Sequence, residues 1–135
     1  MMSRPMTMFE LGQRAMSAQM VRMNAAASNL ANAGSIAATE AETYRPLRAV
    51  FSEQLDAATG MSTVHVNGVF RGDTPAVRRH EPGHPLADEN GDVWTSGVDE
   101  NAESVEMMEA SRQYQNIVEA LSTAKQLMLE TMRMK

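Results

Sequence analysis

Residues 107–131 read MMEASRQYQNIVEALSTAKQLMLET, and this stretch decides how the end of the chain folds. Apolar or aromatic side chains recur in it every seven positions, at Met107, Tyr114, Leu121 and Met128. A second series follows three positions behind the first, at Ala110, Ile117, Ala124 and Thr131. Two such series place a narrow apolar seam on one side of a long helix, which is the pattern that coiled-coil packing requires. The stretch therefore predicts a terminal helix that needs a partner helix.

The start of the chain carries a matching repeat. Its first series is Phe9, Met16, Met23 and Leu30, and its second is Gly12, Gln19, Ala26 and Ala33. Thr7 and Glu10 fit a capping box, so we expect a helix from about Met8 to Ala33, with Gly34 as a left-handed stop. Because helices at both ends of a chain can pair with each other or with neighbouring copies, the pattern favours an assembly protein over an enzyme. The predicted subunit-interface seam consists of Phe9, Met16, Met23, Leu30, Met107, Tyr114, Ile117, Leu121 and Met128.

The middle of the chain has a different character. Residues 35–47 show no clear period and read as a connector, whereas short β-like runs separated by glycine and proline occupy residues 48–98. Asn90-Gly91 is typical of a hairpin turn, because both residues tolerate positive φ. Asp99 or Asn101 would cap the last helix. We therefore predict an α+β chain in which residues 1–34 and 99–135 form a coiled-coil-like helical assembly domain, with a small β-rich excursion between the two helices.

Composition and charge exclude several classes of function. The 135 residues carry a net charge of −5, whereas proteins that bind nucleic acid concentrate positive charge, so we expect no nucleic-acid partner. There is no cysteine, which excludes disulfides and thiolate chemistry. We expect no membrane span and no cleaved signal peptide, because no apolar run is long enough for a span and the start lacks an apolar signal core.

Candidate chemical sites are few. His80 and His84 lie near Glu81 and Asp88, but the prolines and glycine between them remove the helical spacing of zinc-binding histidines. Neither a glycine-rich phosphate loop nor a nucleophile elbow is present. We therefore predict no catalytic residue, no metal site, no cofactor and no small-molecule substrate.

Three stretches resemble the axial proteins of the bacterial flagellum, the rod and hook families. Residues 27–33 are similar to the N-terminal signature that these families share, while residues 81–93 and 110–125 are similar to one family of proximal rod components. The residues that carry the resemblance are Ser28, Asn29, Leu30, Asn32, Glu81, Pro82, Gly83, His84, Pro85, Ser111, Arg112, Tyr114 and Gln115.

The resemblance implies a structural subunit of the proximal rod, located in the flagellar basal body where the rod crosses the periplasm. The implied partners are other copies of the chain, other rod proteins and the proteins on the MS-ring and export-gate side. Delivery would use the flagellar type III export apparatus. Short polar side chains at Ser28, Asn29 and Asn32 are expected to fix register, by bonding across packed helices or to the connector.

Three alternatives remain open at this point. The chain could be a different axial protein of the rod or hook, with residues 81–93 as the discriminating feature. It could be a membrane-surface module that uses its slightly basic, Met-rich first helix. A metal-dependent enzyme built on the histidines is the third.

Overall fold

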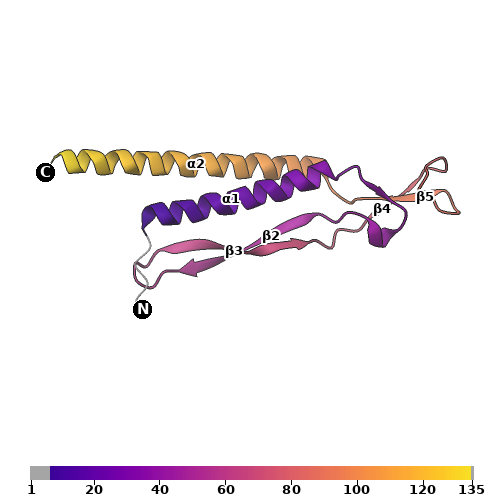
Figure 1. Cartoon of the computed structure of the whole chain (residues 1–135), viewed down its shortest axis with the longest axis horizontal. Helices are drawn as coiled ribbons and strands as arrows, with labels where there is room; N and C mark the ends of the chain where they lie inside the picture. The colour runs from indigo at the N-terminus through magenta and orange to yellow at the C-terminus, as the bar shows by residue number, and fades with distance from the viewer. Residues whose placement is uncertain (1–6, 135) are drawn as a thin grey trace.

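The computed structural model describes residues 7–134; the parts of the predicted ranges that fall on residues 1–6 and 135 lie outside the described residues. These described residues form two long helices and two antiparallel sheets, joined in an elongated molecule (Figure 1). In chain order the elements are α1 (Met8–Ala31), β1 (Ile36–Ala37), η1 (Glu40–Glu42), β2 (Leu47–Leu55), β3 (Ser62–Arg71), β4 (Val77–His80), β5 (Asp92–Thr95) and α2 (Glu100–Arg133). Neither described helix is apolar enough over a sufficient length to cross a membrane.

Helix α1 begins as the sequence predicts and ends differently. The Thr7 side chain accepts a hydrogen bond from the Glu10 backbone N–H, and the Glu10 carboxylate accepts one from the Thr7 N–H, so the capping box is confirmed. The helix stops at Ala31, and Asn32 is its C-cap with φ −107°. Gly34 is not among the described glycines with positive φ, so the predicted left-handed stop there is wrong.

The two helices pack antiparallel, and small side chains line the face of α1. Gly12, Ala18, Ala25 and Ala26 are all buried. The Leu121 side chain lies directly over Gly12, where a Cβ atom would be 2.6 Å from the Leu121 methyl carbons. Because these α1 residues have small side chains or none, the two helices can approach each other closely. Because α2 has 34 residues and α1 has 24, the C-terminal part of α2 extends past the start of α1 (Figure 1).

The β2–β3 hairpin lies along α1 on the side away from α2 (Figure 1). Its antiparallel register runs from Leu47 opposite Arg71 to Leu55 opposite Ser62. A bulge between Val50 and Phe51 leaves Asn67 without an opposite residue in the strand register, next to Gly68 at φ +148°. Helix α1 is therefore covered on two sides, by α2 and by the hairpin.

The second sheet lies beyond the ends of the helices and has the strand order β1-β5-β4 (Figure 1). Its central strand β5 carries Val93, which is fully buried. Strands β4 and β5 are joined by residues 81–91 rather than by a two-residue turn. A tight turn does form at Asn90-Gly91, where the Gly91 N–H donates to the Asp88 carbonyl at 3.0 Å and Gly91 has φ +80°. Asn90 does not have positive φ, so the predicted turn geometry is wrong.

The predicted fold class needs correction. The β structure is not a small excursion, because β2 and β3 are nine and ten residues long and pack on a terminal helix. Nor do the two helices form an independent coiled-coil domain. A two-stranded coiled coil has one apolar seam per helix, whereas α1 contacts α2 on one side and both strands of the hairpin on another. The heptad repeat missed this second contact because residues outside the repeat, among them Arg14, Ala25 and Asn29, face the hairpin.

Candidate functional site

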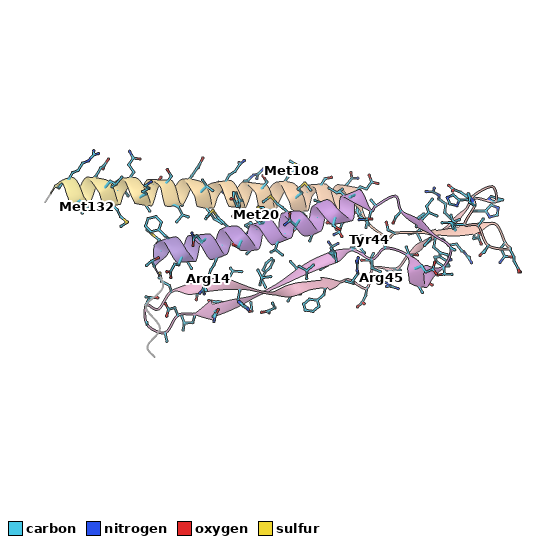
Figure 2. The ribbon with its side chains drawn as sticks, in the orientation of Figure 1. Arg14, Met20, Tyr44, Arg45, Met108 and Met132 are labelled. Carbon is cyan, nitrogen blue, oxygen red and sulfur yellow. The ribbon has the colours of Figure 1, made fainter. Side chains whose placement is uncertain are left out.

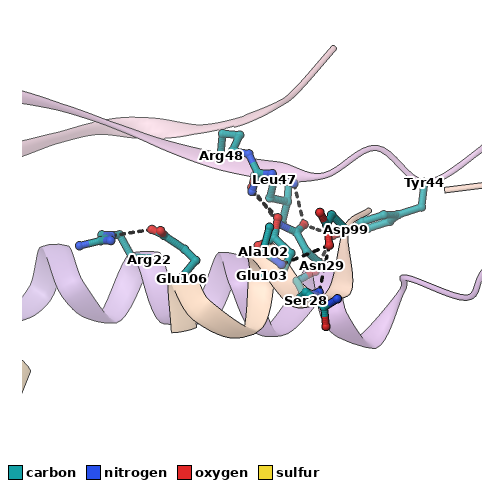
Figure 3. A network of polar contacts seen from close by, with 11 residues as sticks. Arg22, Ser28, Asn29, Tyr44, Leu47, Arg48, Asp99, Ala102, Glu103 and Glu106 are labelled. Atoms are coloured by element: carbon teal, nitrogen blue, oxygen red, sulfur yellow. Dashed lines mark hydrogen bonds and ion pairs between the residues drawn. The ribbon is translucent and has the colours of Figure 1, made fainter. Parts of the chain in front are cut away.

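A buried asparagine joins α1 to the start of the hairpin (Figure 3). The Asn29 side chain is 0% exposed and makes three hydrogen bonds. Its Oδ1 accepts from the Leu47 backbone N–H at 2.7 Å and from the Tyr44 hydroxyl at 2.8 Å. Its Nδ2 donates to the Leu47 carbonyl at 3.0 Å. Asn29 therefore satisfies both backbone groups of the residue that starts β2.

Further polar contacts surround Asn29. The hydroxyls of Ser28 and Tyr44 lie 3.0 Å apart, and the Arg71 guanidinium lies 5.1 Å from the centre of the Tyr44 ring. Asn32 Nδ2 donates to the Ser28 carbonyl at 2.8 Å, while the Ser96 hydroxyl donates to the carbonyl of Ala33 at 2.6 Å. The Asn32 bond stays within the end of α1, whereas the other contacts run to the connector, the hairpin and the end of β5, and none of them crosses between helices.

Two ion pairs fix the first turns of α2. Arg48 on β2 pairs with Glu103 at 2.6 Å, and Arg22 on α1 pairs with Glu106 at 2.8 Å. Glu103 is 2% exposed, and its second oxygen, Oε2, is buried without a hydrogen-bond partner. The four side chains line a cavity of about 270 Å³ between α1, β2 and α2. The Arg48 pair ties the hairpin directly to α2.

The segment that follows β4 is held by local hydrogen bonds. The Glu81 N–H donates to the Gly91 carbonyl at 2.9 Å, and the Leu86 N–H donates to His84 Nδ1 at 3.0 Å. His80 Nδ1 lies 3.0 Å from Asp92 Oδ1. Pro82, Gly83 and Pro85 are exposed. Residues 7–134 contain no group of three or more histidine and acidic side chains arranged to hold a metal ion.

The predicted seam residues are spread along the helix pair rather than gathered at one site. Leu121 lies over Gly12, and Tyr114 lines a surface pocket with Met16 and Met20. Most of the seam is half-buried, but Met128 is 50% exposed. Of the motif residues near Tyr114, Ser111 is half-buried, whereas Arg112 and Gln115 are exposed.

The part of α2 that extends past α1 exposes a group of apolar side chains. Leu127, Met128 and Met132 are 57%, 50% and 70% exposed. With Met8 at the start of α1 they line an open apolar groove of about 730 Å³. Figure 2 shows Met132 on this free part of α2. An exposed apolar patch of this kind is typical of a surface that binds another protein or a membrane.

Sequence reasoning missed the polar contacts that hold the core. Tyr44, Leu47, Arg48 and Glu103 were not candidates, although Glu103 is among the largest fully buried side chains. Glu103 is one of several acids at the start of α2, and nothing in the sequence separates it from its exposed neighbours. Tyr44-Arg45-Pro46 stands out as a motif, but its distance from Asn29 along the chain hides the contact.

The fold and these sites together define an elongated assembly subunit, in which buried polar contacts fix the junction of helices and sheets and an apolar helix end is left uncovered. Comparison with known proteins agrees. Residues 89–134 match the family described as the C-terminal part of the flagellar basal-body rod proteins FlgE, FlgF and FlgG. The flagellar basal-body rod protein FlgC of Salmonella typhimurium is 43% identical over 129 residues, covering 94% of this chain and 95% of its own length. The FlgC protein of Yersinia enterocolitica is 41% identical with the same coverage, and that of Agrobacterium fabrum is 34% identical over 84% of this chain and 82% of its own length.

The chain therefore belongs to the FlgC family of flagellar basal-body rod proteins. Its function is that of a structural subunit of the rod, and its location is the flagellar basal body.

Proposed function

We propose that the chain acts in the proximal part of the rod, where it polymerises with other copies of itself and with other rod proteins and transmits torque without catalysing a reaction. The observation that carries this proposal is the apolar end of α2, where Leu127, Met128 and Met132 are uncovered. Burial of apolar surface is the main favourable term in protein association, at roughly 25 cal/mol per Å².

The proposal assigns separate roles to the parts of the chain. Residues 1–34 and 99–135 pack against neighbouring subunits, residues 35–47 connect, and residues 48–98 lie toward the outside of the rod. The heptad residues pair α1 with α2 and, from Met128 onward, contact a neighbour. Membership of a rod family supports two further sets of partners, the MS-ring and export-gate proteins below the rod and the type III export apparatus that delivers the subunit.

Removing residues 126–135 tests the proposal in cells that carry the truncated gene in place of their own. The apolar end of α2 is lost, while the packing of α1 against α2 at Gly12 and Leu121 stays. We expect the isolated truncated protein to stay folded with a nearly unchanged melting temperature, and its helical circular dichroism to fall only by the share of the deleted helical residues. We expect it to be secreted into the medium, and rods and swimming to be absent.

A full-length variant tests whether swimming requires the apolar side chains at the end of α2 or only the length of the helix. Changing Leu127, Met128 and Met132 together to glutamine keeps α2 intact and removes the apolar side chains, so the same loss of swimming is expected. The matched control changes the exposed polar residues Gln126 and Glu130 to alanine, and these cells should swim normally. Normal swimming by either the truncated strain or the glutamine strain would contradict the proposal.

A further inference from the structure

Two asparagines of the chain are each followed by a glycine, Asn67 by Gly68 and Asn90 by Gly91. An asparagine in this position can close a five-membered ring onto the backbone nitrogen of the next residue, because the two groups belong to one short stretch of chain. Glycine favours the reaction, since it has no Cβ atom to hinder the approach. The same dipeptide occurs here in two different environments, so the fold decides which of the two asparagines reacts.

Asn67 is held within strand β3 of the hairpin. Its Oδ1 accepts a hydrogen bond from the Ser52 hydroxyl at 3.1 Å. Both of its neighbours in β3 pair with residues of β2, Gly68 with Val50 among them. Ring closure would turn the peptide unit between Asn67 and Gly68 and so disrupt this pairing. The hairpin therefore protects Asn67.

Asn90 lies in the loop of residues 81–91 that joins β4 to β5, beyond the ends of the helices (Figure 1). It is exposed, and within residues 7–134 its side chain forms no hydrogen bond. The Gly91 N–H donates to the Asp88 carbonyl at 3.0 Å, a bond within the loop itself. Opening a bond in an exposed loop costs less than breaking a strand pair. Asn90 is therefore the more reactive of the two.

The fold also requires glycine after Asn90. Gly91 has φ +80°, and a Cβ atom there would lie 3.1 Å from Cε1 of His80 and 3.2 Å from Cα of Pro82. A larger residue would be strained in both respects. The turn that closes this loop thus places the least hindered residue directly after an exposed asparagine.

We propose that Asn90 is a site of spontaneous covalent modification, where the asparagine is converted to aspartate and isoaspartate. The Gly91 nitrogen gives its proton to hydroxide and forms a bond to Cγ of Asn90. The bond from Cγ to Nδ2 then breaks, and the amide nitrogen leaves as ammonia with a proton taken from water. Water opens the resulting succinimide ring at either of its carbonyl carbons, which yields aspartate or isoaspartate.

The isoaspartate product would loosen the loop. Its main chain runs through the former side chain of Asn90 and is longer by a methylene group. Gly91 now binds the Asp88 carbonyl through its N–H and the Glu81 N–H through its carbonyl, at 3.0 and 2.9 Å. A longer main chain moves Gly91 out of this register. The new carboxylate also adds a negative charge between Asp88 and Asp92.

Peptide mass spectrometry of purified full-length protein tests the proposal after incubation at physiological temperature and mildly alkaline pH. Trypsin places Asn67 in peptide 49–71 and Asn90 in peptide 80–112, so the two sites are measured separately. In the folded protein, Asn90 should deamidate about tenfold faster than Asn67. In guanidinium chloride the two rates should become similar, because both asparagines then precede glycine in an unfolded chain.

The control Asn90→Gln keeps the backbone hydrogen bonds of the turn and removes the reactive side chain. Peptide 80–112, which also contains Asn101, should then keep its mass. Deamidation of Asn67 as fast as that of Asn90 in the folded protein would overturn the inference. So would the absence of isoaspartate at Asn90, or the same mass change in the Asn90→Gln variant. The Glu81 amide should exchange faster with deuterium in the isoaspartate form, and equal exchange would contradict the loosening of the loop.

Discussion

At the residue scale, Asn29 carries the contact on which the junction of helix and sheet depends. It is fully buried, and its side-chain amide forms hydrogen bonds with both the N–H and the carbonyl of Leu47. A buried polar group that loses its partner costs about 1–3 kcal/mol, whereas an average hydrogen bond contributes only about 1 kcal/mol net. Asn29 is therefore important mainly because its removal would leave the N–H and the carbonyl of Leu47 without their hydrogen-bond partner.

We predict that Asn29→Ala lowers the free energy of unfolding by about 2–4 kcal/mol, because the Leu47 N–H and carbonyl lose their partner together. Urea unfolding followed by circular dichroism measures the change. The control is Asn24→Ala, which removes an exposed amide from the same helix and should shift stability by less than ~0.5 kcal/mol. Equal stability of the two variants would show that Asn29 is dispensable.

At the element scale, the fit between α1 and α2 depends on Gly12. A Cβ atom at this position would be 2.6 Å from the methyl carbons of Leu121, so any side chain there pushes against α2. A flexible leucine can move away from one methyl group, but it cannot make room for a branched side chain without displacing the helix.

We predict that Gly12→Val destabilises the protein by about 1–3 kcal/mol through overpacking, and that adding Leu121→Ala recovers part of the loss. Thermal unfolding of the two variants measures this coupling. Gly34→Val is the comparison, because no atom lies within 4 Å of a Cβ at Gly34 and its φ is not positive. A Gly12 variant as stable as the Gly34 variant would show that the helices are not tightly packed here.

The sequence predicted the helices better than the sheets. The capping box at Thr7 and the long α2 follow from local signals that one helix carries by itself. Strand β1, only two residues long, fell in the predicted connector, because its pairing with β5 depends on residues far along the chain. The hairpin strands were read as separate short runs, because glycine was taken as the end of a run, whereas Gly68 pairs with Val50 beside the bulge and β3 continues through it.

At the scale of the whole molecule, the packing changes along α2. Its first turns are held by ion pairs to α1 and β2, its middle lies against α1, and its last turns extend beyond any described partner (Figure 1). Because a helix gains most of its stability from tertiary packing, the stability of α2 should fall toward its C-terminal end.

We predict a matching gradient in hydrogen exchange of the isolated protein. Amides in residues 103–121 should be well protected, and those in residues 127–133 should exchange much faster, since local opening is easiest where few contacts hold the backbone. In assembled rods the same C-terminal amides should become protected. Uniform protection along α2 in the monomer would contradict this picture of a free end.

The sequence by itself determined the two terminal helices and the resemblance to flagellar rod proteins, because helical periodicity, caps and motifs are local patterns. Only the tertiary structure decided that a hairpin covers α1, that Asn29 binds Leu47, and that Glu103 is buried while Glu109 is exposed. The physical reason is that burial and hydrogen bonding depend on which distant segments meet. The spacing of residues along one helix does not contain that information.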